Sequence, residues 1–225
     1  MRSKLRFGTT LGGVCLTVCL FSASATRLAA AAAAPEDAAE EGFVPLFDGK
    51  TLAGWEGDFE LWRVHDAMIV GDSGAGIKRN EFLATKKKFG DFELRLEFRL
   101  RDGEGNSGVQ FRSKRVEGSS EVSGYQADIG EKYWGCLYDE SRRNKILVQA
   151  PLELEKSLEK GGWNKYVIRA EGTHITLALN GVKTVDYDER DPAIDRAGII
   201  ALQIHAGGPL RVEFRNLRIR ELTPK

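Results

Sequence analysis

Residues 92–100 read Phe-Glu-Leu-Arg-Leu-Glu-Phe-Arg-Leu, and this stretch decides the fold class. Apolar and charged side chains alternate without a break from Phe92 to Leu100. An alternation of period two predicts a β-strand with one face in a core and the other face toward solvent. Such strands are typical of antiparallel sheets, so neighbouring segments should supply partner strands.

Short strands separated by turn residues are predicted on both sides of this stretch. The hairpin signal is strongest at Asn180-Gly181, because both central positions of such a tight turn need positive φ. Residues 152–160 contain the only plausible helix. We therefore predict an all-β fold, a sandwich or jelly roll of two antiparallel sheets, with Trp55, Trp62 and Trp163 in its core. The other predicted strands cover residues 43–47, 62–64, 68–70, 109–112, 146–148, 163–170, 174–180, 182–187, 198–205 and 212–220.

The first 25 residues have the features of a secretory signal sequence. A basic start precedes an apolar run over residues 11–21, which is too short to span a bilayer, and Ala-Ser-Ala at 23–25 is typical of a cleavage site. We predict a secreted or periplasmic protein with no membrane span after cleavage. An uncleaved anchor and a lipid attached to Cys19 are alternatives, although Val18 is bulky for the position before a lipidated cysteine.

The remainder of the 225-residue chain is predicted to hold an Ala- and Glu-rich linker, residues 26–42, and a single β-sandwich domain, residues 43–223. Two of the three cysteines fall in the signal sequence, which leaves Cys136 alone and predicts no internal disulfide. Without the four basic residues before position 28, 29 Lys and Arg face 33 Asp and Glu, a net charge near −4. This balance, with no basic arm, argues against a nucleic acid partner.

Residues 124–144, GYQADIGEKYWGCLYDESRRN, show neither a helix period nor a strand period. The segment combines aromatic rings with charged groups, which suits the wall of a site for a polar ring such as a sugar. Alternation within the predicted strands adds polar side chains that point away from the core, so one sheet face could carry the site. These side chains belong to Glu97, Gln110, Arg112, Gln203 and His205.

Eight motifs in order carry a resemblance that covers residues 43–222. They are FDGKTLAGW at 47–55, DFEL at 91–94 running into EFR at 97–99, NSGV at 106–109 with FR at 111–112, GYQ at 124–126, WN at 163–164, LNG at 179–181, LQIH at 202–205 and FRNLRI at 214–219. This order resembles the family once called domain of unknown function 1080. The family is now described as 3-keto-disaccharide hydrolase, or 3-keto-glucoside 1,2-lyase and 3-keto-2-hydroxy-glucal hydratase. The resemblance implies a concanavalin A-like (lectin/glucanase) jelly roll.

The chain departs from the family pattern at one motif. Many members resemble Gly-Tyr-Glu followed by Gln-Ile, whereas this sequence reads Gly124-Tyr125-Gln126-Ala127-Asp128. The carboxylate therefore comes two positions later. Positions 126 and 128 share one face of a strand, so the carboxylate reaches the same side at a different point.

The resemblance implies a substrate with a ketone at C3 of a sugar, produced by a separate sugar 3-oxidoreductase. The ketone acidifies the proton on C2. A base removes that proton, the enolate is stabilised, the group at C1 leaves with proton help, and water adds back. The site then needs a base, an acid, and donors or a cation at the C3 oxygen.

Three residues are candidates for the base. His205 is the first, because an imidazole side chain is a common acid or base in enzymes, although it could be a packing or surface histidine. Asp128 is the second candidate, with a turn residue or a salt bridge to Arg112 or Arg142 as the alternative. Glu97 is the third, with a strand charge paired to an arginine as the alternative.

Further residues are candidates for substrate contacts. Arg142 and Arg143 could bind the enolate oxygen, or belong to a solvated charged loop. Tyr125 and Tyr138 could donate a proton or stack on the sugar, or simply fill a sheet face, and Trp134 is the predicted stacking platform. The remaining predicted contacts with sugar hydroxyls are Gln126, Asn106 (alternatively a turn residue), Arg112 and Gln203.

No metal-binding spacing is present, so no cofactor is predicted, with a structural Ca²⁺ on loop carboxylates as an alternative. A Ser-His-Asp triad lacks a supporting G-x-S-x-G motif. A retaining glycosidase would need two carboxylates about 5–5.5 Å apart, whereas Glu93 and Glu97 are about 13 Å apart along one strand. A non-catalytic carbohydrate-binding module is the main alternative function. A structural or protein-binding sandwich, with Arg142 and Arg143 at an interface, is another.

Overall fold

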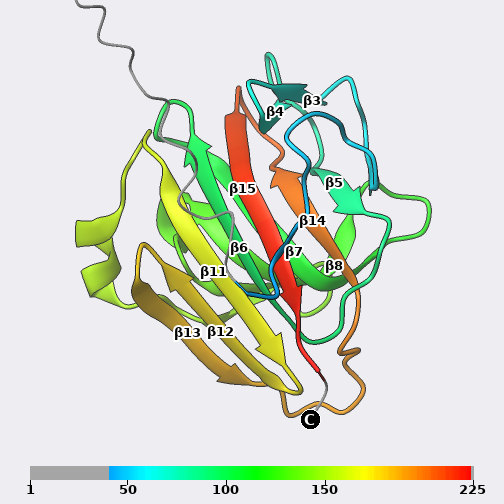
Figure 1. Cartoon of the computed structure of the whole chain (residues 1–225). Coiled ribbons are helices and arrows are strands. Elements are labelled where there is room, and N and C mark those ends of the chain that lie inside the picture. Colours follow the sequence, from blue (N-terminus) through cyan, green and yellow to red (C-terminus); the bar gives the residue numbers. More distant parts are fainter. Residues whose placement is uncertain (1–40, 224–225) are drawn as a thin grey trace, which may run out of the picture. The chain divides into compact units, whose positions relative to one another are not determined.

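The structure is a computed structural model that describes residues 41–223. The predicted signal sequence, Cys19 and nearly all of the predicted linker lie outside these residues. The described chain forms two antiparallel sheets packed face to face, so the predicted all-β sandwich is confirmed (Figure 1). Its helical segments are two 3-10 turns, Glu131–Tyr133 and Leu152–Ser157, and the second replaces the helix predicted at 152–160. None of the described helices has the length and apolar character to cross a membrane.

The eight-stranded sheet contains the stretch that predicts the fold. Residues Phe92–Leu100 form β6 near its centre, with Leu94, Leu96 and Phe98 in the core. The strand order is β13, β12, β11, β6, β15, β4 and β3, and β1 pairs with β15. The bounds of the other strands are β1 Val44–Pro45, β3 Trp62–His65, β4 Met68–Asp72, β11 Asn164–Glu171, β12 His174–Leu179, β13 Val182–Asp188 and β15 Arg211–Glu221.

The seven-stranded sheet takes two strands from the segment that showed no period. Every residue of β8 is buried, because Tyr125, Ala127 and Ile129 face the core while Gln126 and Asp128 are buried on the opposite face. A strand buried on both faces has no alternation to read. The strand order is β10, β9, β8, β7, β14, β5 and β2. The bounds are β2 Trp55–Glu56, β5 Glu81–Thr85, β7 Asn106–Arg115, β8 Val122–Gly130, β9 Leu137–Glu140, β10 Lys145–Val148 and β14 Ile199–Ile204.

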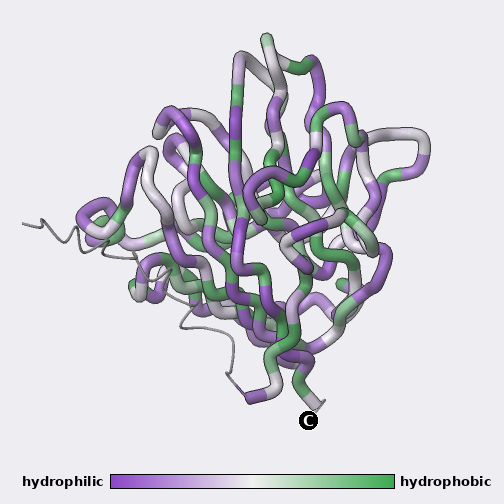
Figure 2. Tube along the Cα trace, turned by 45° about the horizontal axis from the view of Figure 1, so that its top comes forward, coloured by the Kyte–Doolittle hydropathy of each residue, from purple (hydrophilic) through white to green (hydrophobic). Residues whose placement is uncertain are grey.

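The core between the sheets is one large apolar cluster, and apolar and polar positions alternate along many of its strands (Figure 2). Trp55 and Trp62 belong to it, as predicted. Trp163 does not: it is half-buried, and the guanidinium groups of Arg99 and Arg215 lie 4.6 and 3.9 Å from its ring centre. On the outer sheet face the indole instead makes cation–π contacts with these two arginines.

The turn predicted at Asn180-Gly181 is confirmed. Both residues have positive φ, 51° and 82°, and they join β12 to β13. The Asn180 side chain also accepts the backbone N–H of Lys165 at 2.7 Å, which ties the turn to β11. The hairpin therefore sets the register at one edge of the eight-stranded sheet.

Candidate functional site

The outer face of the seven-stranded sheet, on the side away from the core, carries a row of polar residues. Gln110 on β7 pairs with Gln126 on β8, which pairs with Tyr138 on β9. Side chains alternate along a strand, so residues two positions along share this face. We call this surface the candidate site. Its members are Gln110, Gln126, Asp128, Tyr138, Glu140, Gln203 and His205.

The floor of the candidate site is a chain of amide side chains. Gln110 and Gln126 are 0% and 1% exposed, and Nε2 of Gln110 donates to Oε1 of Gln126 at 2.8 Å. The Ser113 hydroxyl donates to Oε1 of Gln110 at 3.0 Å. Gly108 makes room for this arrangement, because a Cβ there would lie 2.5 Å from Cδ of Gln126. Each amide is thereby fixed in one orientation.

Asp128 is the last residue in this series of hydrogen-bonded side chains. Its Oδ2 accepts a hydrogen bond from Nε2 of Gln126 at 3.1 Å, and its Oδ1 accepts one from the backbone N–H of Ile129 at 2.9 Å. The side chain is buried, and this burial raises the pKa of Asp128 well above the ordinary value. The alternative salt bridge to Arg112 or Arg142 is not formed.

Glu140 is a member that the sequence interpretation missed. It lies on β9 opposite Gly124 and is half-buried. Burial raises the pKa of Glu140 and the charge of Glu121 raises it further, whereas His205 lowers it. Hydrogen bonds connect the neighbours of the two residues: the Ser141 hydroxyl donates to Glu121, the adjacent Ser120 donates to the Asn80 carbonyl at 2.7 Å, and the Asn80 side chain accepts the backbone N–H of Ala206 at 2.8 Å. The only signal in the sequence was the alternation over residues 137–140, which is too short to separate a strand from a loop.

His205 follows β14 and shares the face of Gln203. Its Nδ1 lies 2.7 Å from the carbonyl oxygen of Ala206. A carbonyl can only accept, so Nδ1 carries the hydrogen and Nε2 is the nitrogen left for a proton transfer. Gln203 is fully buried, and neither polar atom of its amide has a partner within the described residues.

Aromatic surface is available beside these groups. Tyr138 is half-buried on the same face as Gln126. Its ring meets that of Tyr133 edge to face, with ring centres 6.0 Å apart and an interplanar angle of 80°. A tyrosine with one open face can stack on the C–H groups of a sugar.

Tyr125, Arg142 and Arg143 were predicted to act in the site, but the structure does not bring them to this face. Tyr125 points into the core, where its ring stacks on Phe111 with centres 5.6 Å apart. Its hydroxyl donates to Oε2 of Glu189 at 2.5 Å. Side chains alternate along a strand, and Tyr125 is one residue from Gln126, so its side chain points to the other side of β8.

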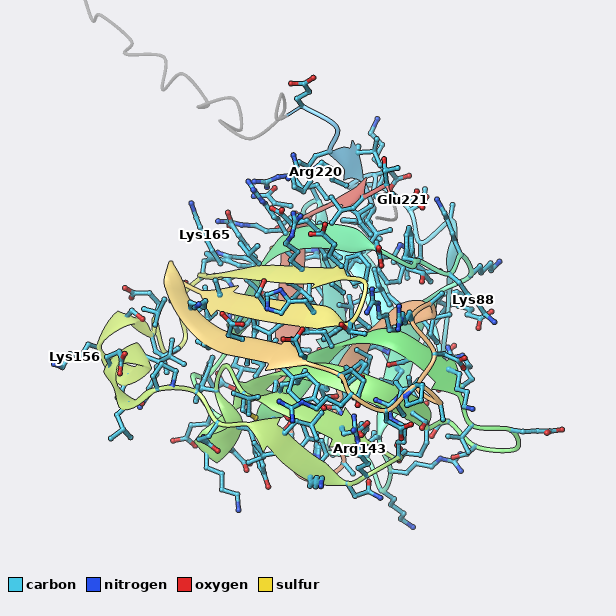
Figure 3. The ribbon with its side chains drawn as sticks, turned by 90° about the horizontal axis from the view of Figure 1, so that it is seen from below. Lys88, Arg143, Lys156, Lys165, Arg220 and Glu221 are labelled. Carbon is cyan, nitrogen blue, oxygen red and sulfur yellow. The ribbon has the colours of Figure 1, made fainter. Side chains whose placement is uncertain are left out.

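The two arginines are held on the core side by buried carboxylates. Both donate to Asp139, which is fully buried, and Arg143 also donates to Glu189 at 2.7 Å. The Arg142 guanidinium lies 4.5 Å from the ring centre of Tyr125. Figure 3 shows Arg143 beside the seven-stranded sheet, on the side opposite Lys165 and Arg220. These contacts join the β9–β10 turn to the end of β13.

Three further predicted residues have different positions, whereas Asn106 lies four positions before Gln110 on β7 and shares its face. Arg112 has positive φ (45°) at a register shift in β7, which turns its side chain from the face of Gln110 to Asp91, at 2.7 Å. The expected shared face is therefore wrong for Arg112. Glu97 lies on the outer face of the other sheet. The remaining placements are Glu97 bonded to Arg215 at 2.7 Å, Trp134 in the core with its ring centre 6.1 Å from that of Phe98, and Asn106 half-buried at the start of β7 with Oδ1 unpartnered.

Residues 41–223 contain no group of three or more His, Cys, Asp and Glu side chains arranged to hold a metal ion. The prediction that the protein needs no cofactor stays a prediction.

Comparison with known proteins gives a family. A family model described as a 3-keto-alpha-glucoside-1,2-lyase-like domain matches residues 42–220. A curated 3-keto-disaccharide hydrolase of Bacteroides thetaiotaomicron is 32% identical over 91 residues, which make up 36% of this chain and 30% of that relative. The match therefore spans less than a third of the relative's length.

Solved structures share the fold at low sequence identity. A Parabacteroides distasonis protein, provisionally assigned as a glycosyl hydrolase, superposes with a TM-score of 0.63 at 19% identity over 81% of this chain and 95% of that one. A carbohydrate-binding module of Bacillus subtilis gives 0.59 at 16% identity over 75% and 96%. A β-glucanase of Bacillus licheniformis gives 0.52 at 9% identity over 80% and 97%. These neighbours confirm the predicted lectin/glucanase type of jelly roll.

Proposed function

The chain belongs to the 3-keto-alpha-glucoside-1,2-lyase-like family, and from this premise we propose that it cleaves 3-keto-glycosides on the outer face of its seven-stranded sheet. The observation that carries the proposal is the meeting of two carboxyl groups, an imidazole and a row of amides on that one face. The reaction removes the C2 proton, expels the C1 group and adds water to the resulting double bond.

The electrostatics of the face suit proton transfer. Burial raises the pKa of both Asp128 and Glu140, which moves these acids toward neutral pH. An acid or base works best when its pKa lies near the working pH. His205, whose Nε2 is left for proton transfer, is suited to the leaving oxygen at C1.

An unpaired amide lies beneath the groups that act on the sugar. Gln203 is fully buried, and neither polar atom of its amide has a hydrogen-bond partner within the described chain. Tyr138 and Tyr133 offer aromatic surface beside it. A 3-keto sugar requires a separate oxidoreductase to make it, and the predicted secretion would place the reaction outside the cytoplasm; both stay predictions.

The test is to incubate the purified protein with a 3-keto-glucoside and with the unoxidised glucoside, and to follow release of the aglycone. We expect release from the keto substrate alone. His205→Ala should slow this release by about 10²–10⁴-fold, the usual contribution of a general acid. His174→Ala is the matched control, because His174 is exposed on the other sheet and pairs with Asp186 at 2.8 Å.

Two outcomes would contradict the proposal. Release from the unoxidised glucoside would indicate an ordinary glycosidase. No release from either compound, with sugar binding retained, would indicate the alternative function of a non-catalytic carbohydrate-binding module.

A further inference from the structure

The two carboxyl groups of the candidate site, those of Asp128 and Glu140, differ in how accessible they are to a substrate. Asp128 is only 3% exposed, and each of its oxygens already accepts a hydrogen bond. A base must present a free lone pair within hydrogen-bond distance of the proton that it removes. Asp128, as it is placed, does not meet the access requirement.

The surroundings of Asp128 also hold it in place. Its partner Gln126 is fixed by Gln110 at 2.8 Å and lies over Gly108, where no side chain competes for the space. Gln110 in turn accepts from Ser113 at 3.0 Å. Turning Asp128 toward a substrate would break this chain of buried hydrogen bonds, which is costly. Asp128 therefore belongs to the floor of the site.

Glu140 is more accessible than Asp128. It is half-buried, and within the described part of the chain its carboxylate is hydrogen-bonded by the backbone of Ser141 and by no side chain. It faces Gly124, so no side chain across the strand pair covers it. Burial raises the pKa of Glu140, which makes its carboxylate a stronger base. The titratable groups around it are Glu121, Asp128, Tyr138, Asp139 and His205.

We propose that Glu140, rather than Asp128, is the base that removes the C2 proton, with His205 as its acid partner. This assignment rests on the proposed function. The Glu140 carboxylate takes the C2 proton while the protonated His205 gives its Nε2 proton to the oxygen that leaves C1. Neutral His205 then takes a proton from water, the hydroxide bonds to C1, and Glu140 returns its proton to C2.

Hydrogen exchange in D₂O separates these two roles. The base alone is sufficient for the C2 proton of a 3-keto-glucoside to exchange, whereas aglycone release also needs the acid. We expect Glu140→Gln to lower both rates by about 10²–10⁴-fold. His205→Ala should lose release but keep exchange at C2. The C4 proton, which is also next to the ketone, reports the uncatalysed exchange in the same sample.

Two further variants are controls for Glu140→Gln. Glu153→Gln changes an exposed carboxylate on the 3-10 turn Leu152–Ser157, outside the candidate site, and should leave both rates unchanged. Asp128→Asn should lower the rates by about tenfold or less, the effect of one weakened hydrogen bond. Thermal unfolding of each variant shows whether it is folded.

The outcomes distinguish this assignment from the proposed function. Exchange and release that persist in Glu140→Gln, or exchange that is lost in Asp128→Asn instead, would overturn the role of Glu140 and leave the proposed function standing. A wild-type protein that neither exchanges C2 nor releases the aglycone would overturn the proposed function and the assignment together.

Discussion

At the level of single residues, Asp128 should make stability depend on pH. An acid whose pKa is raised by burial binds its proton more tightly in the folded state than in the unfolded state. Folding stability from this group is therefore present below its ordinary pKa of 3.8 and is lost as pH rises through the raised value. Asn at this position cannot ionise, so the loss should disappear in Asp128→Asn.

We expect the unfolding temperature of the wild type, relative to Asp128→Asn, to fall as pH rises from about 4 to about 8. Thermal unfolding across that range measures it. Asp48→Asn is the control, because backbone hydrogen bonds from Thr51 and Lys50 lower the pKa of Asp48 and move its effect below this range. If the difference in unfolding temperature between the wild type and Asp128→Asn does not change with pH, Asp128 is not buried as described.

At the level of elements, one contact joins β8 to the end of β13. The Tyr125 hydroxyl donates to Glu189 at 2.5 Å, and Arg143 donates to the same oxygen at 2.7 Å. Burial would raise the pKa of Glu189, but these hydrogen bonds outweigh it and lower the pKa to about 2. The contact thus stabilises the fold above pH 4.5, the ordinary pKa, and is lost as pH falls through about 2.

Tyr125→Phe removes this hydroxyl and tests whether it serves stability or catalysis. We expect a loss of about 1.5–3 kcal/mol in the free energy of unfolding at pH 7, the range for a hydrogen bond to a charged group. The difference should shrink as pH falls toward 2, and aglycone release per folded molecule should be kept. Urea unfolding at several pH values measures the first part. Unchanged stability with lost release would instead support the catalytic role predicted from the sequence.

Whether a strand could be predicted from the sequence depended on whether its two faces have different surroundings. β6 was predicted to the residue, because one face meets the core and the other carries charges. β8 was not, because both of its faces are buried. The same alternation placed Gln110 and Gln203 on one face, but it misplaced Arg112, where a bulge with positive φ reverses the direction of the side chain.

Members of the candidate site were predicted where a family motif or a recognisable strand carries them. Gln126, Asp128 and His205 follow from position parity and the family motifs. Glu140 lies on a four-residue strand, and its relation to His205 depends on strands that are far apart in sequence. Arg142 and Arg143 were assigned by charge alone, and sequence could not show that Asp139 and Glu189 already bind them.

At the level of the whole molecule, the two outer faces have different chemistry. On the eight-stranded sheet, buried Glu93 binds Arg95, Arg169 and Arg220 at 2.6–3.1 Å, so these charges are largely paired. Two aromatic rings on that face are covered as well, Trp163 by Arg99 and Arg215 and Phe43 by Arg95 and Arg220. The seven-stranded sheet instead offers unpaired amide groups and two acids of raised pKa. This contrast is why we place the sugar on the seven-stranded sheet.

The measurement that tests this placement most directly is a crystal structure of Glu140→Gln with a bound 3-keto-glucoside. The account predicts the sugar over Gln126 and Gln203, with C2 facing residue 140 and the C1 oxygen near Nε2 of His205. A sugar stacked on Trp163, or bound anywhere else while the outer face of the seven-stranded sheet stays empty, would contradict it.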